Sequence, residues 1–316
     1  MEVVLGIDVG GTGLRGALAP ASGEPVPFAR ASQAIGLRRG AGGIEGVVPA
    51  AAALAASLLA GRDVRVKAVA LGCAGAADLG AELRISLPAA LRAACGPATV
   101  VVASDMVTAF LGALAGSPGV TLSAGTGAVA FGGDLSGEWR RADGRGDLIG
   151  DLGGGAWLGR AGMTAALRAS DGRRGGSPLL LRHLLAAYGD PAALIRELNA
   201  RADRAAVLAR FAPAVLEAAR SGDRVAADIR AEACRHLADT ALAARPTGLL
   251  SPVPLAVVGG LPDHHPDFRA ALLGALDPGF AVRPAAGSPV EGALRLAASA
   301  DRLPPGLSSW GVQVTA

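Results

Sequence analysis

Short apolar runs alternate along the chain with longer alanine-rich segments. The short apolar runs, several of them bounded by turn residues, predict β-strands at 3–8, 14–19, 24–32, 66–76 and 98–105. The alanine-rich segments predict helices at 47–60, 106–116, 191–245 and 288–300. Segment 253–276 predicts a strand, a Gly-Gly turn and a helix. Strands that alternate with helices in this way indicate an α/β fold.

A strand–turn–strand unit occurs twice in the chain. The first is GIDVGGTGLRGAL at 6–18, and the second is GVTLSAGTGAVAFGG at 119–133. Laid over each other, they match Gly11-Thr12-Gly13 with Gly125-Thr126-Gly127. The repeat predicts two similar α/β halves, of which the second carries extra helices.

The first glycine turn has two interpretations. Glycine lets the backbone approach a ligand, and successive N–H groups form a concave site for anions, so Gly10, Gly11, Thr12 and Gly13 can hold a phosphate. Asp8, at the end of the strand, then holds Mg²⁺. The alternative is a tight hairpin in which Asp8 is only a turn residue.

Two better-known phosphate loops are excluded by the sequence. The G-x-x-x-x-G-K-[ST] loop needs a lysine, and Lys67 is the only lysine in the chain. A dinucleotide fingerprint needs a helix after its glycines, whereas LRGALA at 14–19 is short and leads into a turn. Any bound phosphate must therefore be held by backbone amides, hydroxyls and a metal ion.

Two further aspartates follow strands or turns. Asp105 comes directly after the apolar run VVVAS and begins a helix, so it is either a helix cap or a general base in the cleft of the sheet. Asp151 lies in LIGDLGGGAWLGR and is either a turn residue or a group that accepts hydrogen bonds from a polyol.

Composition narrows the classes of partner. The net charge of +3 does not indicate nucleic acid, because the arginines are scattered and aromatic residues make up 3% of the chain. The apolar runs are too short to span a membrane, and the amino terminus lacks the pattern of a signal peptide, so we expect a cytoplasmic protein. Cys73, Cys95 and Cys234 are far apart, which disfavours disulfides and a zinc ribbon.

Taken together, these motifs resemble the acetate/sugar kinase–Hsp70–actin superfamily. Within it the chain is similar to the BadF/BadG/BcrA/BcrD-type ATPases, which include N-acetylglucosamine kinases. The similarity rests on six ordered segments: the two glycine turns, VVVASDMVTAFLGAL, GDLGGGAWLGRAGMTAALRA, LAVVGGL and SPVEGALRLA. It extends over nearly the whole chain.

The resemblance implies two actin-like (ribonuclease H-like) domains with ATP and a sugar in the cleft between them. The smaller domain comprises 1–116 together with a returning helix in 289–316, and the larger comprises 117–288 with a helical insertion. The family pattern makes Asp105 the catalytic base, which also contacts the sugar. It places Asp8 and Mg²⁺ beside the ATP phosphates, which are held by the residues of both glycine turns: Gly10, Gly11, Thr12, Gly13, Gly125, Thr126 and Gly127. Gly259 and Gly260 lie against the adenosine.

The sugar site departs from the family pattern. Asp143, Gly144 and Arg145 stand where relatives often read Gly-Gly-Trp, and Leu152 follows Asp151 in place of a glutamate. The asparagine often found near 36–43 is missing. Asp151 keeps its expected sugar contact. One hypothesis is that Asp143 accepts the ammonium group of an unacetylated amino sugar such as glucosamine.

The predicted function is therefore transfer of the γ-phosphoryl group of ATP to a hydroxyl of an amino sugar, by a homodimer. Two alternatives stay open. One is an ATPase that activates a dehydratase-type enzyme through an iron–sulfur cluster, which needs closely placed cysteines. The other is a sugar sensor without catalytic activity.

Overall fold

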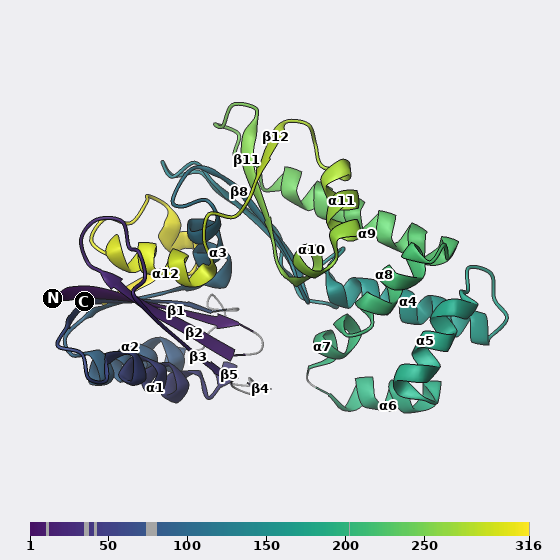
Figure 1. Ribbon diagram of the computed structural model, residues 1–316, viewed down its shortest axis with the longest axis horizontal. Helices are drawn as coiled ribbons and strands as arrows, with labels where there is room; N and C mark the ends of the chain where they lie inside the picture. The colour runs from purple at the N-terminus through teal and green to yellow at the C-terminus, as the bar shows by residue number, and fades with distance from the viewer. Residues whose placement is uncertain (11–12, 35–37, 41–42, 74–80, 202, 316) are drawn as a thin grey trace.

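Two separate β-sheets, each packed with helices, make up the protein (Figure 1). The computed structural model describes residues 1–10, 13–34, 38–40, 43–73, 81–201 and 203–315. Gly11 and Thr12 of the first glycine turn, and most of the loop at 35–42, lie outside the described residues. The observed architecture confirms the predicted α/β class with two actin-like sheets.

The first sheet combines an antiparallel hairpin unit with parallel strands. Its order is β13-β7-β6-β1-β2-β3, in which β1, β6 and β7 are parallel. The strands are β1 (Glu2–Gly10), β2 (Gly13–Pro20), β3 (Ala29–Ala34), β6 (Arg65–Cys73), β7 (Thr99–Ser104) and β13 (Gln313–Thr315). A separate pair, β4 (Arg38–Gly40) and β5 (Gly43–Glu45), completes the strands of this half.

The second sheet has the same arrangement. Its order is β10-β9-β8-β11-β12, with an antiparallel unit followed by two parallel strands. The strands are β8 (Gly119–Ala124), β9 (Ala128–Gly133), β10 (Trp139–Asp143), β11 (Val253–Val258) and β12 (Phe280–Arg283). In each half the first strand therefore pairs with a hairpin partner on one side and a parallel strand on the other, and the hairpin agrees with the strand–turn–strand repeat of the sequence.

Helices cover both sheets. The first half has α1 (Val47–Leu59), α2 (Ala81–Cys95) and α3 (Asp105–Ala113), and the last helix is α12 (Pro289–Ala298). The second half has α4 (Gly155–Ser170), α5 (Pro178–Tyr188), α6 (Pro191–Ala200), α7 (Arg204–Ala209), α8 (Ala212–Arg220), α9 (Arg224–Ala243), α10 (Gly260–His264) and α11 (Pro266–Ala275). A short 3₁₀ turn covers Leu307–Trp310. None of the helices among the described residues is long and apolar enough to cross a lipid bilayer.

The last helix returns to the first sheet. α12 packs against α3 and β1, on the face of the sheet opposite α1 and α2 (Figure 1). Glycines make this contact close: a Cβ added at Gly292 would overlap the Thr108 carbonyl, and one at Gly6 would lie 2.7 Å from the Val290 carbonyl oxygen. The backbones of α12, α3 and β1 are therefore in direct contact, although α12 is far from the other two in the sequence.

An aromatic cluster joins the two halves. Phe110 of α3 contacts Phe131 and Trp139 of the second sheet, with ring centroids 5.7 and 5.5 Å apart. Trp310, near the carboxyl terminus, contacts Phe131 at 5.5 Å. Trp139 Nε1 also donates to the Pro305 carbonyl at 2.7 Å. Edge-to-face pairs of this kind favour one arrangement of the rings over others.

Several element boundaries differ from those predicted. The third strand begins at Ala29, not at Glu24, since Pro25 and Pro27 have no N–H to donate to the ladder. The helical region begins earlier than predicted, because α5 starts with Ser177 as an N-cap and Pro178 at the first helical position. The final segment adds β13 to the first sheet, a strand that the sequence analysis did not predict.

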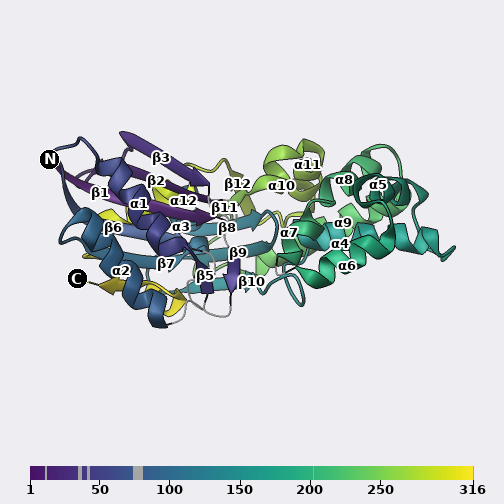
Figure 2. The ribbon, with the colours of Figure 1, turned by 90° about the horizontal axis from the view of Figure 1, so that it is seen from below.

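The carboxyl ends of both sheets come to the middle of the molecule. In Figure 1 the first sheet runs from left to right, and β8 and β11 run downward to the right. Figure 2, turned by 90°, also places the ends of β1 and of β8 in the middle of the molecule. In α/β sheets, ligands bind at the carboxyl ends of the parallel strands, so we expect the active site in this region.

The glycine contact between α12 and α3 can be tested by adding one methyl group. We expect Gly292→Ala to lower the free energy of unfolding by about 1–3 kcal/mol, because the new Cβ meets backbone that cannot yield. Gly274→Ala is the matched control: Gly274 also lies in a helix, but an added Cβ there meets nothing within 4 Å. It should be neutral, or stabilising by up to about 1 kcal/mol. Equal unfolding midpoints for the two variants in urea would contradict the packing argument.

Candidate active site

Asp8 lies near the carboxyl end of β1 and is buried, with 5% of its surface exposed. The pKa of its carboxyl group is raised to about 6 by burial, with a further contribution from the negative charge of Asp105. Arg15 opposes this shift: it faces Asp8 across the hairpin, and its Nη1 lies 3.8 Å from Asp8 Oδ2. A bound cation would remove the cost of holding two carboxylates together in this place.

Asp105 begins α3 at the end of β7. The register places Asp8 beside Gly72 of β6, and Gly72 beside Ala103 of β7, which brings residues 8 and 105 to one edge of the sheet. Ser104 Oγ and the Met106 N–H donate to Asp105 Oδ1 at 3.2 and 2.9 Å. These two hydrogen bonds orient the Asp105 carboxylate. Asp105 is only partly buried, so a substrate can reach it.

Gly72 allows α3 to lie close to β6, because a Cβ at position 72 would overlap the Thr108 side chain of α3. In the adjoining hairpin, Gly10 and Gly13 pair as the last described residues on either side of the first turn. The structure thus places Asp8, Gly10, Gly13 and Asp105 at one edge of the first sheet, and the roles of Gly11 and Thr12 stay predictions.

The second glycine turn is fastened to the start of α4. The Gly155 and Ala156 N–H groups donate to the carbonyls of Gly125 and Thr126, both at 2.8 Å, and the Gly125 N–H donates to the Gly127 carbonyl at 2.9 Å. Within the described residues, the N–H groups of Thr126 and Gly127 have no hydrogen-bond acceptor. An exposed turn with two unpaired N–H groups is suited to bind an anion such as phosphate.

Asp143 and Asp151 hold one turn together. Asp143 Oδ1 and Oδ2 accept hydrogen bonds from the Asp151 and Leu152 N–H groups at 2.6 and 2.7 Å. Asp151 Oδ1 accepts from the Gly146 N–H at 3.2 Å. Each aspartate has positive φ, 61° for Asp143 and 56° for Asp151. Aspartate tolerates this conformation better than most residues, so the turn itself accounts for both residues.

The same turn reaches the second glycine hairpin. A Cβ at Gly127 would overlap the Asp151 carboxylate, so this position needs glycine. Burial raises the pKa of Asp151. Gly144 and Arg145 are exposed in the loop that follows β10. Contacts of Asp143, Gly144, Arg145 and Asp151 with a sugar stay predictions.

Gly259 joins β11 to α10. Its φ is 110°, and an added Cβ would overlap the Ala124 carbonyl at the end of β8. Gly260 is the first residue of α10 and is exposed. The Gly-Gly turn therefore lies beside the β8–β9 turn, and contact of either glycine with adenosine stays a prediction.

Arg15 is a residue that the sequence analysis missed. Gly10 pairs with Gly13, which places residue 15 opposite residue 8, so the position of Arg15 follows from counting along the two strands. The prediction that Asp8 holds Mg²⁺ fits the donors present, because Mg²⁺ binds one or two carboxylates together with phosphate oxygens. Among the described residues, no three histidine, cysteine, aspartate or glutamate side chains form a metal cluster.

Comparison with known proteins places this chain in a family. Residues 5–271 match the BadF/BadG/BcrA/BcrD ATPase family, so the chain belongs to that family. ATP is accordingly its nucleotide. Among curated proteins none matches the chain.

Solved structures share the fold. A candidate N-acetylglucosamine kinase from Chromobacterium violaceum is 27% identical with a TM-score of 0.68, and the match covers 93% of this chain and 98% of that one. A second candidate N-acetylglucosamine kinase, from Porphyromonas gingivalis, is 20% identical with a TM-score of 0.64 and covers 93% and 98%. A ROK family glucokinase from Streptomyces griseus, in complex with glucose and AMPPNP, is 19% identical with a TM-score of 0.55 and covers 93% and 99%.

The raised pKa of Asp8 predicts a pH-dependent cost. Between pH 3.8 and about 6 the unfolded state loses this proton before the folded state, so stability falls as the pH rises through that window. The full penalty above pH 6 is about 3 kcal/mol. We expect Asp8→Asn to gain stability relative to the original protein between pH 4.5 and 7.5, measured by urea unfolding. Asp171→Asn, at an exposed aspartate, is the control, and parallel profiles for Asp8→Asn and the original protein would contradict the shift.

Proposed function

We propose that this member of the BadF/BadG/BcrA/BcrD ATPase family transfers the γ-phosphoryl group of ATP to a hydroxyl of an amino sugar. The observation that carries the proposal is the pair Asp8 and Asp105, which lie close enough for the charge of one to raise the pKa of the other. The ATPase family and the kinases among the solved relatives support an ATP-dependent carbohydrate kinase. The amino sugar, Mg²⁺, the homodimer and the cytoplasmic location belong to the proposal.

Asp105 acts as the general base. Its carboxylate accepts the proton of the sugar hydroxyl as that oxygen bonds to the γ-phosphorus and the bond to ADP breaks. Ser104 Oγ and the Met106 N–H orient the carboxylate, so it does not have to be ordered when the sugar binds.

The remaining residues hold the phosphates. The unpaired N–H groups of Thr126 and Gly127 bind phosphate oxygens from the second sheet, while Gly10 to Gly13 approach from the first. Asp8 holds Mg²⁺, whose charge stabilises the negative charge on the transferred group. Gly259 and Gly260 lie against the adenosine beside the β8–β9 turn.

The sugar lies near the turn from Asp143 to Asp151. The two relatives titled N-acetylglucosamine kinases support an amino sugar as the acceptor. Each Asp143 oxygen already accepts a hydrogen bond from a backbone N–H, so Asp143 stabilises the turn. The Asp151 carboxylate lies beside Gly127 of the second glycine turn, and it is the better candidate to accept hydrogen bonds from sugar hydroxyls.

The cysteines do not support the alternative of an iron–sulfur activator. Cys95 ends a helix of the first half, whereas Cys234 lies in the core of the second. Burial raises the pKa of both thiols to about 11, which disfavours the thiolate that binds iron.

Removing the base separates catalysis from nucleotide binding. We expect Asp105→Asn to lower kcat for phosphoryl transfer by about 10²–10⁴-fold, while the Kd for ATP changes less than about threefold. ADP release measures the first quantity and calorimetry the second. Asp171→Asn should keep full activity. An Asp105→Asn variant with unchanged kcat would show that Asp105 is not the catalytic base.

A screen of acceptors tests the sugar. We expect ADP release with amino sugars at a kcat/KM at least about tenfold above that with glucose. A preference for glucosamine over N-acetylglucosamine would support an ammonium contact at Asp143, and the opposite preference would exclude it. ATP binding without ADP release for any sugar would favour the sensor alternative.

A further inference from the structure

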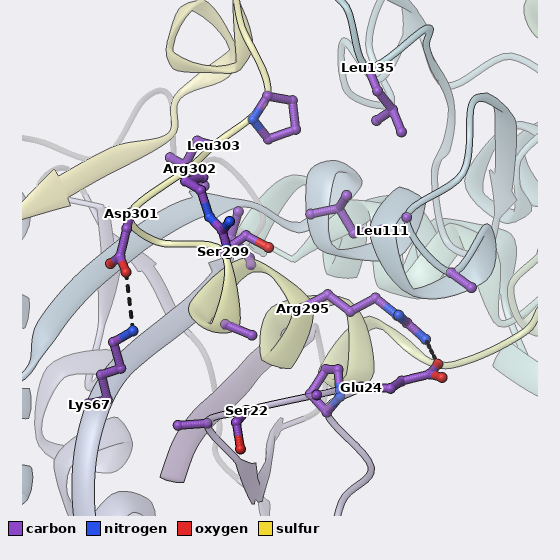
Figure 3. Close-up of a pocket in the computed structure, with 18 residues that line it drawn as sticks. Ser22, Glu24, Lys67, Leu111, Leu135, Arg295, Ser299, Asp301, Arg302 and Leu303 are labelled. Atoms are coloured by element: carbon purple, nitrogen blue, oxygen red, sulfur yellow. Dashed lines mark hydrogen bonds and ion pairs between the residues drawn. The ribbon is translucent and has the colours of Figure 1, made fainter. Parts of the chain in front are cut away.

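A cavity of about 820 Å³ is lined by residues at both ends of the chain and by Leu135 (Figure 3). Part of its wall is the turn after β2, at 21–25, which is at the other end of β2 from the Gly13 turn. The eight residues of β2 separate the two turns by roughly 20–25 Å. The cavity is therefore distinct from the region of Asp8 and Asp105.

The cavity lies where the two halves meet. Its wall includes the end of α12, the residues that follow α3 and, from the second half, Leu135 of the β9–β10 turn. Its volume is in the range of sites for small molecules, and its lining includes leucine and proline side chains as well as charged groups. An occupant would touch elements of both halves.

Among the charged groups of the wall, Arg302 has no ion-pair partner within the part of the chain that the structure describes. Arg295 Nη2 pairs with Glu24 Oε1 at 2.7 Å, and Lys67 Nζ pairs with Asp301 Oδ2 at 3.1 Å. Figure 3 shows Arg302 between these two pairs. Arg302 is exposed and makes no ion pair with any other described residue, so the lining carries one net positive charge.

Arg295 also has a hydrogen-bond donor that is not satisfied by the described residues. Arg295 Nε is buried and has no hydrogen-bond partner among the described residues. A buried N–H without an acceptor is unfavourable, so the guanidinium gains a hydrogen bond if it turns toward an acceptor in the cavity. Arg295 Nε is buried in this arrangement. An anion would therefore pair first with Arg302, and then with Arg295 once the Arg295 side chain has rotated toward it.

We propose that this cavity is a second binding site, for a small organic anion with one phosphate or carboxylate group on an apolar body. The anion pairs with Arg302 and Arg295, and its body lies against Leu135, Leu296 and Leu303. Nothing in the proposal depends on phosphoryl transfer, because binding is measured directly.

The test is a calorimetric titration of the full chain with phenyl phosphate and with benzoate, which separates phosphate from carboxylate recognition. Benzyl alcohol is the uncharged control. We expect saturable binding of at least one anion and none of the alcohol. Arg302→Gln should weaken the Kd about tenfold or more, since a charged hydrogen bond is lost. Arg174→Gln, at another exposed loop arginine, should leave the Kd unchanged.

A second variant adds a carboxylate to the wall. Ser299 is exposed at the end of α12, so Ser299→Glu should fold normally and abolish anion binding by pairing with the nearby cations. Two results would overturn the proposal. One is the absence of saturable binding of both anions to the original protein. The other is binding that neither Arg302→Gln nor Ser299→Glu weakens, which would place the anion elsewhere, for example at the glycine turns.

Discussion

The approach of two carboxylates at one sheet edge is the constraint on which the site depends. Asp8 is buried, and burial together with the charge of Asp105 raises its pKa to about 6. Such a pair is costly unless a cation accompanies it, and the Arg15 guanidinium, 3.8 Å from Asp8, compensates only in part. A site that is unfavourable when empty and favourable with a metal and its phosphates is suited to bind magnesium nucleotide.

The scaffold that creates this pair is built on close backbone contacts. Gly72 lets α3 lie against β6, and Gly6 and Gly292 let α12 lie against β1 and α3. In the second half, Gly259 lies against the Ala124 carbonyl at the end of β8, and Gly127 leaves room for the Asp151 carboxylate. Both halves therefore present a short turn at the carboxyl end of a central strand, and the aromatic rings of Phe110, Phe131 and Trp139 join the halves.

Much of this organisation could be predicted from the sequence. Apolar runs, glycine turns and the Gly-Thr-Gly repeat are local signals, and they predicted the α/β class and the hairpin that occurs in both sheets. The ends of the strands were harder to predict. The apolar pattern allowed a strand from Glu24, but Pro25 and Pro27 cannot donate backbone hydrogen bonds, and β3 begins at Ala29. Arg15 could be inferred only by counting the register across the turn.

The partners of Asp143 could not be predicted. Its bonds to the Asp151 and Leu152 N–H groups depend on the positive φ of both aspartates, which the residue type permits but does not require. The ion pairs that line the second cavity join segments more than 200 residues apart, such as Glu24 with Arg295. Interactions of that kind come from tertiary structure and leave no local pattern.

The most direct measurement is the pKa of the Asp8 carboxyl group by NMR, without ligand and with magnesium and ADP. The account predicts a value near 6 without ligand, because of burial and Asp105, and a clear decrease when the metal and nucleotide bind. A value near 3.8 in the protein without ligand, or a raised value that does not change with magnesium and ADP, would contradict it.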